Sequence, residues 1–201
     1  LGVAPQGLVR PVYLSYLEEA AEGTEVIGSL FEPDYEALFA LNPDLIIAGG
    51  RSTEQVPELA RIAPTLDMTI WQDTIGEGLA RLEAYGKVFD KEEEAAALTA
   101  AFEDKLAQTK DALAGKGRAL IVMTNGPKIS AYGAGGRFGW LHEALGLPEA
   151  VQDVEMANHG EAISFEFIRE ANPDILLVID RMAAIGQESE GARATLDNAL
   201  V

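Results

Sequence analysis

The chain has 201 residues, a formal net charge of −18 and no cysteine. Its acidity argues against nucleic acid and anionic membrane surfaces as direct partners, because both repel a negatively charged protein, and the lack of cysteine excludes disulfides, thiolate metal sites and cysteine nucleophiles. Its length suffices for one large or two small domains, and no apolar run approaches the roughly 20 residues of a membrane-spanning helix.

Apolar segments separated by Gly and Pro divide the first 90 residues into short elements. The alternation of strands with helices predicts parallel sheets covered by helices. The elements expected here are, in chain order, a strand at residues 1–4, a helix at 12–17, a strand at 26–28, a helix at 33–41, a strand at 45–48, a helix at 54–62 interrupted at Pro57, a strand ending at 70 and a helix at 74–89.

The next segment predicts one long helix followed by a second α/β region. Residues 91–114 are rich in Ala, Glu, Leu and Lys, which have high helix propensity. At about 1.5 Å per residue, such a helix is long enough to connect two lobes. We therefore divide the chain into an N-terminal lobe (1–89), a connecting helix (90–115) and a C-terminal lobe (116–201). The second lobe is expected to contain strands at 118–123 and 129–132 and helices at 138–145 and 192–200.

One sequence pattern occurs twice, and both copies end in arginine. Residues 35–51 read YEALFALNPDLIIAGGR and residues 165–181 read FEFIREANPDILLVIDR. Each copy predicts a helix, an Asn-Pro-Asp turn, a buried strand and a cation, Arg51 or Arg181, at the strand's carboxyl end. Ligands of open α/β sheets bind outside these ends, so the repeat suggests two lobes that hold one anionic ligand. Each arginine alone also fits a solvent-facing side chain, or one that pairs with a carboxylate such as Asp180.

Arg137 is a third candidate for ligand binding. It lies in the segment GGRFGW (residues 135–140), where glycines let the backbone approach a ligand closely. The segment lacks the glycine order of nucleotide-binding loops, so we discount a nucleotide. The alternative interpretation is a tight turn with an exposed arginine.

His159 lies in a loop just before the second copy of the repeat. The other histidine, His142, lies in a predicted helix, so the chain has neither an HExxH motif nor three histidines for a transition-metal site. His159 is therefore either an ordinary surface residue or the group that completes the coordination of a metal already wrapped by a chelator. No nucleophile elbow and no spaced acid–base pair is visible, so no enzyme is expected.

Several motifs together resemble the ferric-siderophore-binding proteins of ABC importers. NPDLII is common to all helical-backbone (class III) periplasmic binding proteins, whereas GRFGW, HGEAISFE and IDR are similar to the narrower branch that binds catecholate siderophores. The motifs are GSLFEPDYE (residues 28–36), NPDLII (42–47), KISAYG (128–133), GRFGW (136–140), HGEAISFE (159–166) and VIDR (178–181).

The resemblance implies two Rossmann-like, three-layer αβα lobes with parallel sheets, joined by the long backbone helix, with the ligand in the cleft between them. It implies that Arg51, Arg137 and Arg181 face an anionic Fe(III)-siderophore complex of the catecholate, enterobactin-like kind. It also implies that His159 ligates the iron only where the siderophore leaves coordination positions open. No other cofactor and no catalytic residue is implied.

The resemblance further implies delivery to the permease of an ABC importer. Surface glutamates of such proteins dock on the permease, and the candidates are Glu54 in the first lobe and Glu188 or Glu190 in the second, each of which also fits a solvated glutamate. The protein is expected to be a monomer, periplasmic or a cell-surface lipoprotein, with no nucleic-acid partner and no membrane insertion of this chain. Members of the family carry a further strand and helix at each end, with a tyrosine iron ligand in the last segment, and this chain is expected to lack them.

Two other interpretations stay open at this point. One keeps the fold and changes the ligand to haem, cobalamin or another iron chelate, although three arginines disfavour a neutral hydroxamate complex. The other is an enzyme on a related two-lobed fold, such as a metal chelatase. That activity needs a base or a metal-inserting histidine, for which only His159 is available.

Overall fold

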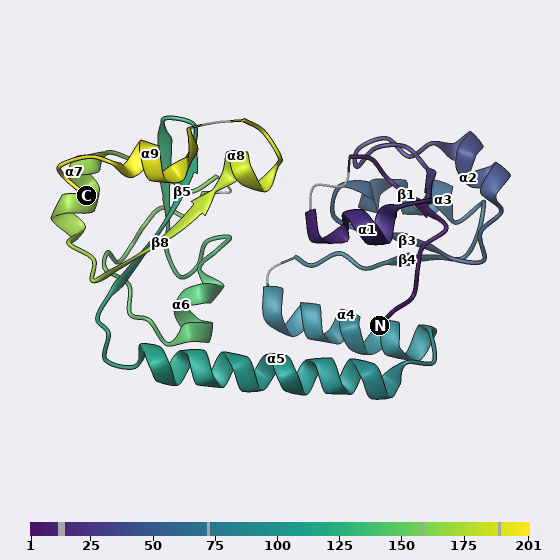
Figure 1. Ribbon diagram of the computed structural model, residues 1–201, viewed down its shortest axis with the longest axis horizontal. Helices are drawn as coiled ribbons and strands as arrows, with labels where there is room; N and C mark the ends of the chain where they lie inside the picture. Colours follow the sequence, from purple (N-terminus) through teal and green to yellow (C-terminus); the bar gives the residue numbers. More distant parts are fainter. Residues whose placement is uncertain (12–14, 72, 158, 189) are drawn as a thin grey trace. The chain divides into compact units, whose positions relative to one another are not determined.

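The computed structural model describes residues 1–201 except 12–14, 72, 158 and 189. The chain forms two compact units, Leu1–Thr99 and Ala100–Val201 (Figure 1). The division falls within α5 (Glu92–Leu113), a helix of 22 residues that lies where the sequence predicted one. The assignment of residues 90–115 as a connecting helix between lobes 1–89 and 116–201 stays a prediction.

Unit 1 contains two pairs of short parallel strands with helices between them. Its core is a cluster of buried apolar residues from α2, β3, α3 and the segment before β4, namely Leu38, Ile46, Ala48, Leu59 and Ala63. β1 pairs with β2, and β3 pairs with β4. The elements are β1 (Gly7–Leu8), η1 (Ser15–Leu17), α1 (Glu18–Ala21), β2 (Glu25–Val26), α2 (Tyr35–Leu41), β3 (Ile46–Ala48), η2 (Gly50–Gln55), α3 (Val56–Leu59), β4 (Thr65–Asp67) and α4 (Thr74–Val88).

Three predictions for unit 1 need correction. The strand expected at residues 1–4 is absent, and the first strand is β1, because only Gly7 and Leu8 find a partner, in β2. The helix expected at 12–17 lies partly outside the described residues, and its last three residues form a 3₁₀ turn. Instead of one helix at 54–62, η2 leads into α3, and Pro57 lies in the first turn of α3, where its missing N–H costs nothing.

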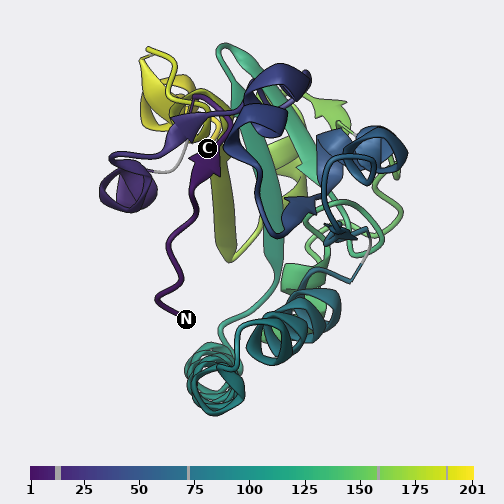
Figure 2. The same ribbon diagram turned by 90° about the vertical axis from the view of Figure 1, so that its right-hand side faces the viewer.

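Unit 2 is built on a four-stranded sheet in the order β7-β6-β5-β8. β5 and β6 are the two inner strands, and the first six residues of β5 are buried. Figure 2 shows β5, in teal, beside β8, in yellow-green. Apolar clusters from β5 and β6 pack against α7 on one side and the segment around Phe138 and Leu141 on the other. The elements are β5 (Ala119–Asn125), β6 (Lys128–Tyr132), α6 (Trp140–Leu145), β7 (Glu161–Ile163), α7 (Phe165–Ala171), β8 (Ile175–Asp180), α8 (Arg181–Ala184) and α9 (Gly191–Leu196).

The expectation of parallel sheets holds only in part for unit 2. β5 and β8 are parallel, but β6 is antiparallel to both β5 and β7. The reason is the connection between β5 and β6, which consists of Gly126 and Pro127 alone. Two residues make a hairpin and are far too few for a parallel crossover. β7 was not predicted, because a strand of only three residues shows no recognisable pattern in the sequence.

Both copies of the repeat form the predicted helix, turn and strand, but the strands are not buried as predicted. Ile47 of β3 is 45% exposed, and no residue of β8 is buried, because β8 lies at the edge of its sheet. Asp34 caps α2 by accepting a hydrogen bond from the Ala37 N–H, and Ser164 caps α7 in the same way from Phe167. Each helix ends at the asparagine of the Asn-Pro-Asp turn, Asn42 or Asn172, which adopts the left-handed conformation. β3 and β8 follow directly, so each repeat delivers its arginine to the carboxyl end of a parallel strand. Within the described part of the chain, no helix combines the length and the apolar character needed to cross a membrane.

Candidate ligand-binding site

Arg51 belongs to a turn that hydroxyl groups hold in place. After β3 the chain turns at Gly50, whose φ of +58° favours glycine. The Gly50 N–H donates to Thr69 Oγ1 at 2.9 Å, and Thr69 Oγ1 also lies 2.7 Å from Thr53 Oγ1. Thr69 is only 4% exposed and follows β4, the parallel neighbour of β3. The turn that carries Arg51 is therefore fastened to the adjacent strand.

Asp67, the last residue of β4, orients Thr69. The Asp67 carboxylate accepts hydrogen bonds from the hydroxyl and the backbone N–H of Thr69. These two bonds lower the pKa of the Asp67 carboxyl, with a smaller contribution from the Arg81 guanidinium. Arg81 donates to the Thr69 carbonyl at 3.0 Å. Through Arg81, helix α4 therefore also holds Thr69, the residue to which the Arg51 turn is fastened.

The Arg51 side chain itself is exposed and lies beside an aromatic ring. Its Cζ is 5.8 Å from the centroid of the Phe31 ring, within the range of a cation–π interaction. Among the described residues, the ion pairs are Arg61–Glu58, Lys87–Glu83 and Lys91–Glu94, and none involves Arg51, Arg137 or Arg181. All three guanidinium groups thus remain available for an anion. In particular, Arg181 does not pair with Asp180.

Arg137 projects from a compact glycine-rich turn of unit 2. The Gly136 N–H donates to the Gly133 carbonyl and the Gly139 N–H to the Gly136 carbonyl, both at 2.9 Å. The Arg137 side chain is exposed, and its Cζ lies 5.2 Å from the centroid of the Phe138 ring. The Arg137 guanidinium therefore lies over the ring of the next residue in the chain, as the Arg51 guanidinium lies over the Phe31 ring.

Arg181 is the first residue of α8 and directly follows β8. Asp180 caps this helix by accepting from the Ala183 N–H at 3.0 Å, and its second oxygen accepts from the Ala192 N–H of α9 at 2.7 Å. The Ala183 bond is the largest cause of the lowered pKa of the Asp180 carboxyl, followed by the Ala192 bond. Arg181 Nη1 donates to Asn125 Oδ1, at the end of the neighbouring strand β5, at 3.3 Å. This bond points the exposed guanidinium toward β5.

Tyr132 is a buried residue next to the glycine-rich turn, and the sequence did not single it out. It is 2% exposed, and its burial raises the pKa of its hydroxyl, while the charges of Arg137 and Arg181 oppose that rise. The Tyr132 ring also packs edge to face on Phe138, with 4.9 Å between the centroids. The signal that could have revealed Tyr132 is the KISAYG motif, which places an aromatic residue just before the glycine-rich turn.

The His159 loop packs on the same ring. A β-carbon at Gly160 would lie 2.8 Å from Tyr132 Cζ, and Gly160 has a φ of +74°. Only glycine fits there without strain, so Gly160 packs its backbone against Tyr132, one residue after the exposed His159. Among the described residues, no group of three or more His, Asp or Glu side chains is arranged to hold a metal ion. His142 is buried and its Nδ1 lies 3.0 Å from the Leu147 carbonyl, which is a structural contact.

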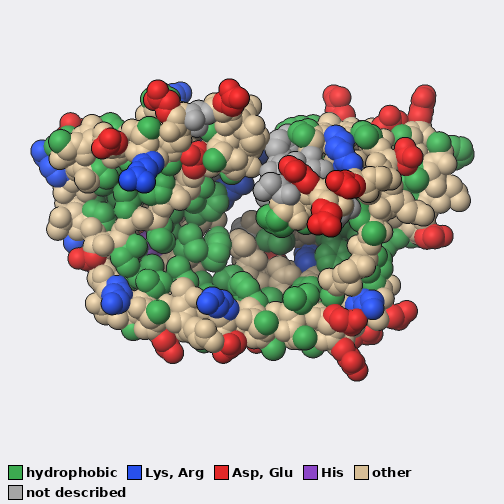
Figure 3. All heavy atoms as spheres, in the orientation of Figure 1, with side chains coloured by type: hydrophobic (Ala, Val, Ile, Leu, Met, Phe, Trp, Pro, Cys, Tyr) green, Lys and Arg blue, Asp and Glu red, His purple; other side chains and the backbone are tan. Residues whose placement is uncertain are grey.

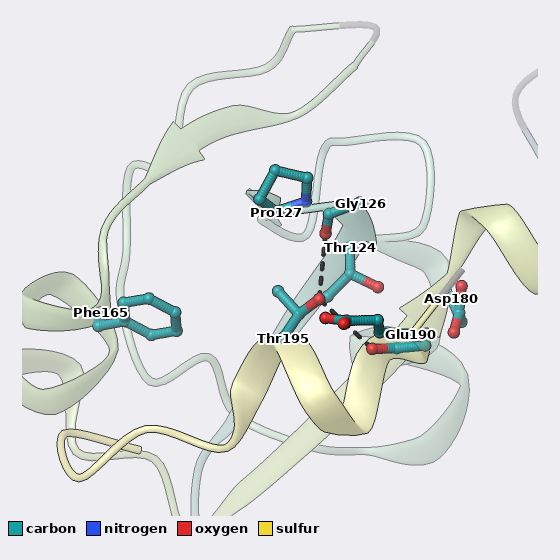
Figure 4. Close-up of a pocket in the computed structure, with 8 residues that line it drawn as sticks. Thr124, Gly126, Pro127, Phe165, Asp180, Glu190 and Thr195 are labelled. Carbon is teal, nitrogen blue, oxygen red and sulfur yellow. Dashed lines mark hydrogen bonds between the residues drawn. The ribbon is translucent and has the colours of Figure 1, made fainter.

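One pocket of unit 2 has an acidic lining. It has a volume of about 470 Å³, and its charged lining residues, Asp180 and Glu190, are both acidic. Figure 4 shows Phe165 on one side of this pocket and Asp180 on the other, with Thr195 bonded to the Gly126 carbonyl. Carboxylates disfavour an anionic ligand, so this pocket is not where we expect the anion to bind.

The three glutamates considered for partner contacts are all exposed. Glu54 lies in η2, close to Arg51 in the chain, and Glu188 and Glu190 lie between α8 and α9. Acidic side chains are otherwise spread over the visible surface and do not form a single patch (Figure 3). The net charge alone therefore does not identify the docking residues.

Comparison with known proteins places this arrangement in a family. The chain matches the family described as "Periplasmic binding protein" over residues 1–200. The chain belongs to this family. The similarity extends over both units.

The petrobactin-binding protein YclQ of Bacillus subtilis is 36% identical over 183 residues, which is 90% of this chain and 57% of YclQ. Its crystal structure superposes with a TM-score of 0.85, covering 98% of this chain and 70% of that one. The ferric-anguibactin-binding protein FatB of Vibrio anguillarum is 30% identical over 193 residues, 92% of this chain and 60% of FatB. The periplasmic catecholate-siderophore-binding protein VctP of Vibrio cholerae gives a TM-score of 0.89 at 31% identity, over all of this chain and 74% of VctP.

These similarities confirm the predicted α/β fold of class III periplasmic binding proteins and the resemblance to siderophore-binding proteins. The chain spans less than two thirds of the length of YclQ and of FatB. The relatives named here are binding proteins, which supports a binding role over catalysis at the level of the family.

Proposed function

We propose that this protein captures an anionic ferric siderophore of the catecholate type and delivers it to the permease of an ABC importer, outside the cytoplasm. The observation that carries the proposal is that Arg137 and Arg181, both exposed in unit 2, have no ion-pair partner among the described residues. The named ligands of YclQ, FatB and VctP support the iron-chelate class.

Charge explains why such a ligand suits these residues. A ferric tris-catecholate carries about three negative charges, and three guanidinium groups balance them through charge-assisted hydrogen bonds. Arg51 supplies the third group from unit 1. The protein's overall charge of −18 opposes a trianion only at long range, since salt screens exposed charges beyond about 8–10 Å.

His159 has a conditional role in this proposal. It is exposed and directly precedes Gly160, which packs on Tyr132, so it suits an iron ion that its siderophore leaves incompletely coordinated. The iron is cargo and not a resident cofactor. With a siderophore that fills all coordination positions, His159 makes no bond to the metal.

Glu54, Glu188 and Glu190 are the proposed contacts with the permease. All three are exposed, and Glu190 also lines the acidic pocket at α9. Carboxylates at such positions fit basic residues of a partner. Location in the periplasm or on the cell surface as a lipoprotein, and a monomeric state, remain part of this proposal.

Ligand titration tests the function directly. Ferric tris-catecholate, ferric citrate and a neutral ferric hydroxamate are added separately to the iron-free protein while tryptophan fluorescence is recorded. We expect strong quenching by the catecholate and weak or no quenching by the hydroxamate. Absence of binding to any catecholate, or tighter binding of the hydroxamate, would overturn the proposal. Mass spectrometry of the ligand that co-purifies from iron-starved cells then identifies the siderophore.

A further inference from the structure

Trp71 in unit 1 is exposed although its backbone is fixed. Its side chain is 71% exposed, whereas its N–H donates to Glu77 Oε2 in the first turn of α4 at 2.6 Å. A large aromatic side chain that leaves so much apolar area in water gains little from folding. Exposed apolar surface of this kind marks contact sites when it lies beside other apolar or charged groups.

Trp71 and Arg51 emerge from the same end of a strand pair. β3 and β4 are parallel, with Ala48 opposite Asp67, so their carboxyl ends lie together. Arg51 comes three residues after β3 and Trp71 four residues after β4. The hydrogen bond between Gly50 and Thr69 ties the two segments. Trp71 is two residues beyond Thr69, at most about 7 Å along the chain.

Phe31 adds a second exposed ring at this end of the unit. It is 58% exposed and lies in a tight turn, in which the Ser29 N–H donates to the Glu32 carbonyl at 2.9 Å. An isolated bridge between Gly28 and Pro33 closes the base of the turn. The ring is therefore presented by a fixed backbone, and the Arg51 guanidinium lies over it at 5.8 Å.

We propose that Trp71, with Phe31 and Arg51, forms an aryl-binding subsite that stacks on an aromatic ring of the ferric chelate. The subsite rests on the proposed function. It lets unit 1 distinguish aromatic from aliphatic iron chelates. An electron-rich, anionic aryl ring offers a planar face to Trp71 and charged oxygens to Arg51. A purely aliphatic chelate such as ferric citrate can bind the Arg51 guanidinium but has no aromatic ring to stack on Trp71.

The experiment compares two variants with two chelates. Trp71→Ala is tested beside Phe39→Ala, a matched control, because Phe39 is 76% exposed on α2 and lies toward the amino end of β3. Isothermal titration calorimetry measures the affinity for ferric tris-catecholate and for ferric citrate. We expect Trp71→Ala to weaken catecholate binding about three- to tenfold and to leave citrate binding unchanged. Trp71→Phe should retain most of the affinity, and Phe39→Ala all of it.

The outcomes separate this inference from the function on which it rests. If the wild-type protein binds neither chelate, the proposed function fails. If it binds catecholate and Trp71→Ala binds equally well, the subsite is disproved while the function stands. An equal loss for both chelates, or a loss of transport without a loss of affinity, also overturns the subsite, the latter because Trp71 would then contact a protein partner. Circular dichroism and thermal melting verify that each variant is folded.

Discussion

The two copies of the repeat deliver the same residue to the end of a strand but support it by different chemistry. Arg51 lies in a 3₁₀ turn whose direct contacts are the hydroxyl groups of Thr69 and Thr53, with the Asp67 carboxylate behind Thr69. Arg181 begins a helix that the carboxylate of Asp180 caps directly. The strand therefore determines where each arginine emerges, and the residues after the strand determine how firmly it is held.

The surroundings of the two arginines differ as well. Arg51 stands with Phe31 in unit 1. Arg181 donates to Asn125 at the end of β5, and Arg137 lies over the Phe138 ring, both in unit 2. Unit 2 thus carries two of the candidate cations, and unit 1 carries one.

The largest expected effect tests this division of charge. The double variant Arg137→Gln/Arg181→Gln should weaken ferric tris-catecholate binding about a thousandfold, since each charge-assisted hydrogen bond contributes about 1.5–3 kcal/mol. Arg51→Gln alone should weaken it about ten- to a hundredfold. Calorimetric titration measures both. Arg169→Gln, an exposed arginine on α7, is the control and should bind as the wild type does. An Arg51 effect equal to that of the double variant would contradict the comparison.

A second prediction concerns the buried ring of unit 2. Tyr132→Ala should lower the free energy of unfolding by about 3–5 kcal/mol, because a large buried aromatic side chain leaves a cavity. Denaturant titration followed by circular dichroism measures it. Tyr132→Phe keeps the ring and should cost far less, since the described partner of the hydroxyl is the Met123 sulfur, at 3.8 Å. A large loss in Tyr132→Phe would show that the hydroxyl, and not the ring, organises the site.

The corresponding change in unit 1 should be smaller. Thr69→Val preserves the shape of the side chain and removes the hydroxyl that accepts from the Gly50 N–H. We expect a loss of about 1–3 kcal/mol, the cost of leaving polar groups unsatisfied. Hydrogen exchange at the Gly50 amide should accelerate, while exchange in α8 stays the same. Unchanged exchange at Gly50 would mean that the hydroxyl network does not hold the Arg51 turn.

The smallest effect is a pH dependence, which both turns share because the pKa of the Asp67 carboxyl and that of the Asp180 carboxyl are both lowered. It is tested here on the Arg181 side. The pKa of the Asp180 carboxyl in the folded protein lies below its ordinary value of 3.8. Its stabilisation is therefore fully present above that ordinary value and is lost as the pH falls through the folded pKa. Asp180→Asn should melt below the wild type at pH 7, and the difference should shrink as the pH falls below about 4. If the difference in melting temperature between the two proteins stayed constant down to pH 3, the Asp180 carboxylate would not be the group that stabilises α8.

Much of this fold was predictable where the signals were local. The bounds of α2, β3, α7 and β8 follow from an N-cap, an Asn-Pro-Asp turn and an apolar strand, all within one repeat. The antiparallel β6 was also encoded locally, in the Gly126-Pro127 hairpin, but the alternation of strands and helices suggested only parallel pairing. β1, β2 and β7 were not found accurately, because two or three residues cannot show a periodicity.

The candidate site was predictable only in its residue types. The repeat and the glycine-rich turn indicated Arg51, Arg137 and Arg181, which are exposed and free of ion pairs in the described chain. That the Arg137 turn packs on Tyr132 through Phe138 depends on tertiary packing, in which Ile121 of β5 pairs with Tyr132 of β6. Such a tertiary register is not visible in the sequence around Arg137. The role of each site residue stays a prediction.

The hairpin between β5 and β6 has a consequence for the order of folding. β6 begins three residues after β5 ends, whereas the other partner of β5 is β8, where Ile175 pairs with Ala119 56 residues later. Local pairs close in microseconds, and distant pairs carry a larger loop-closure cost. During synthesis β5 therefore acquires one neighbour at once and waits for the other with its second edge open. A growing chain is most prone to misassembly in that interval, and the edge of β5 is where a chaperone would have the most to protect.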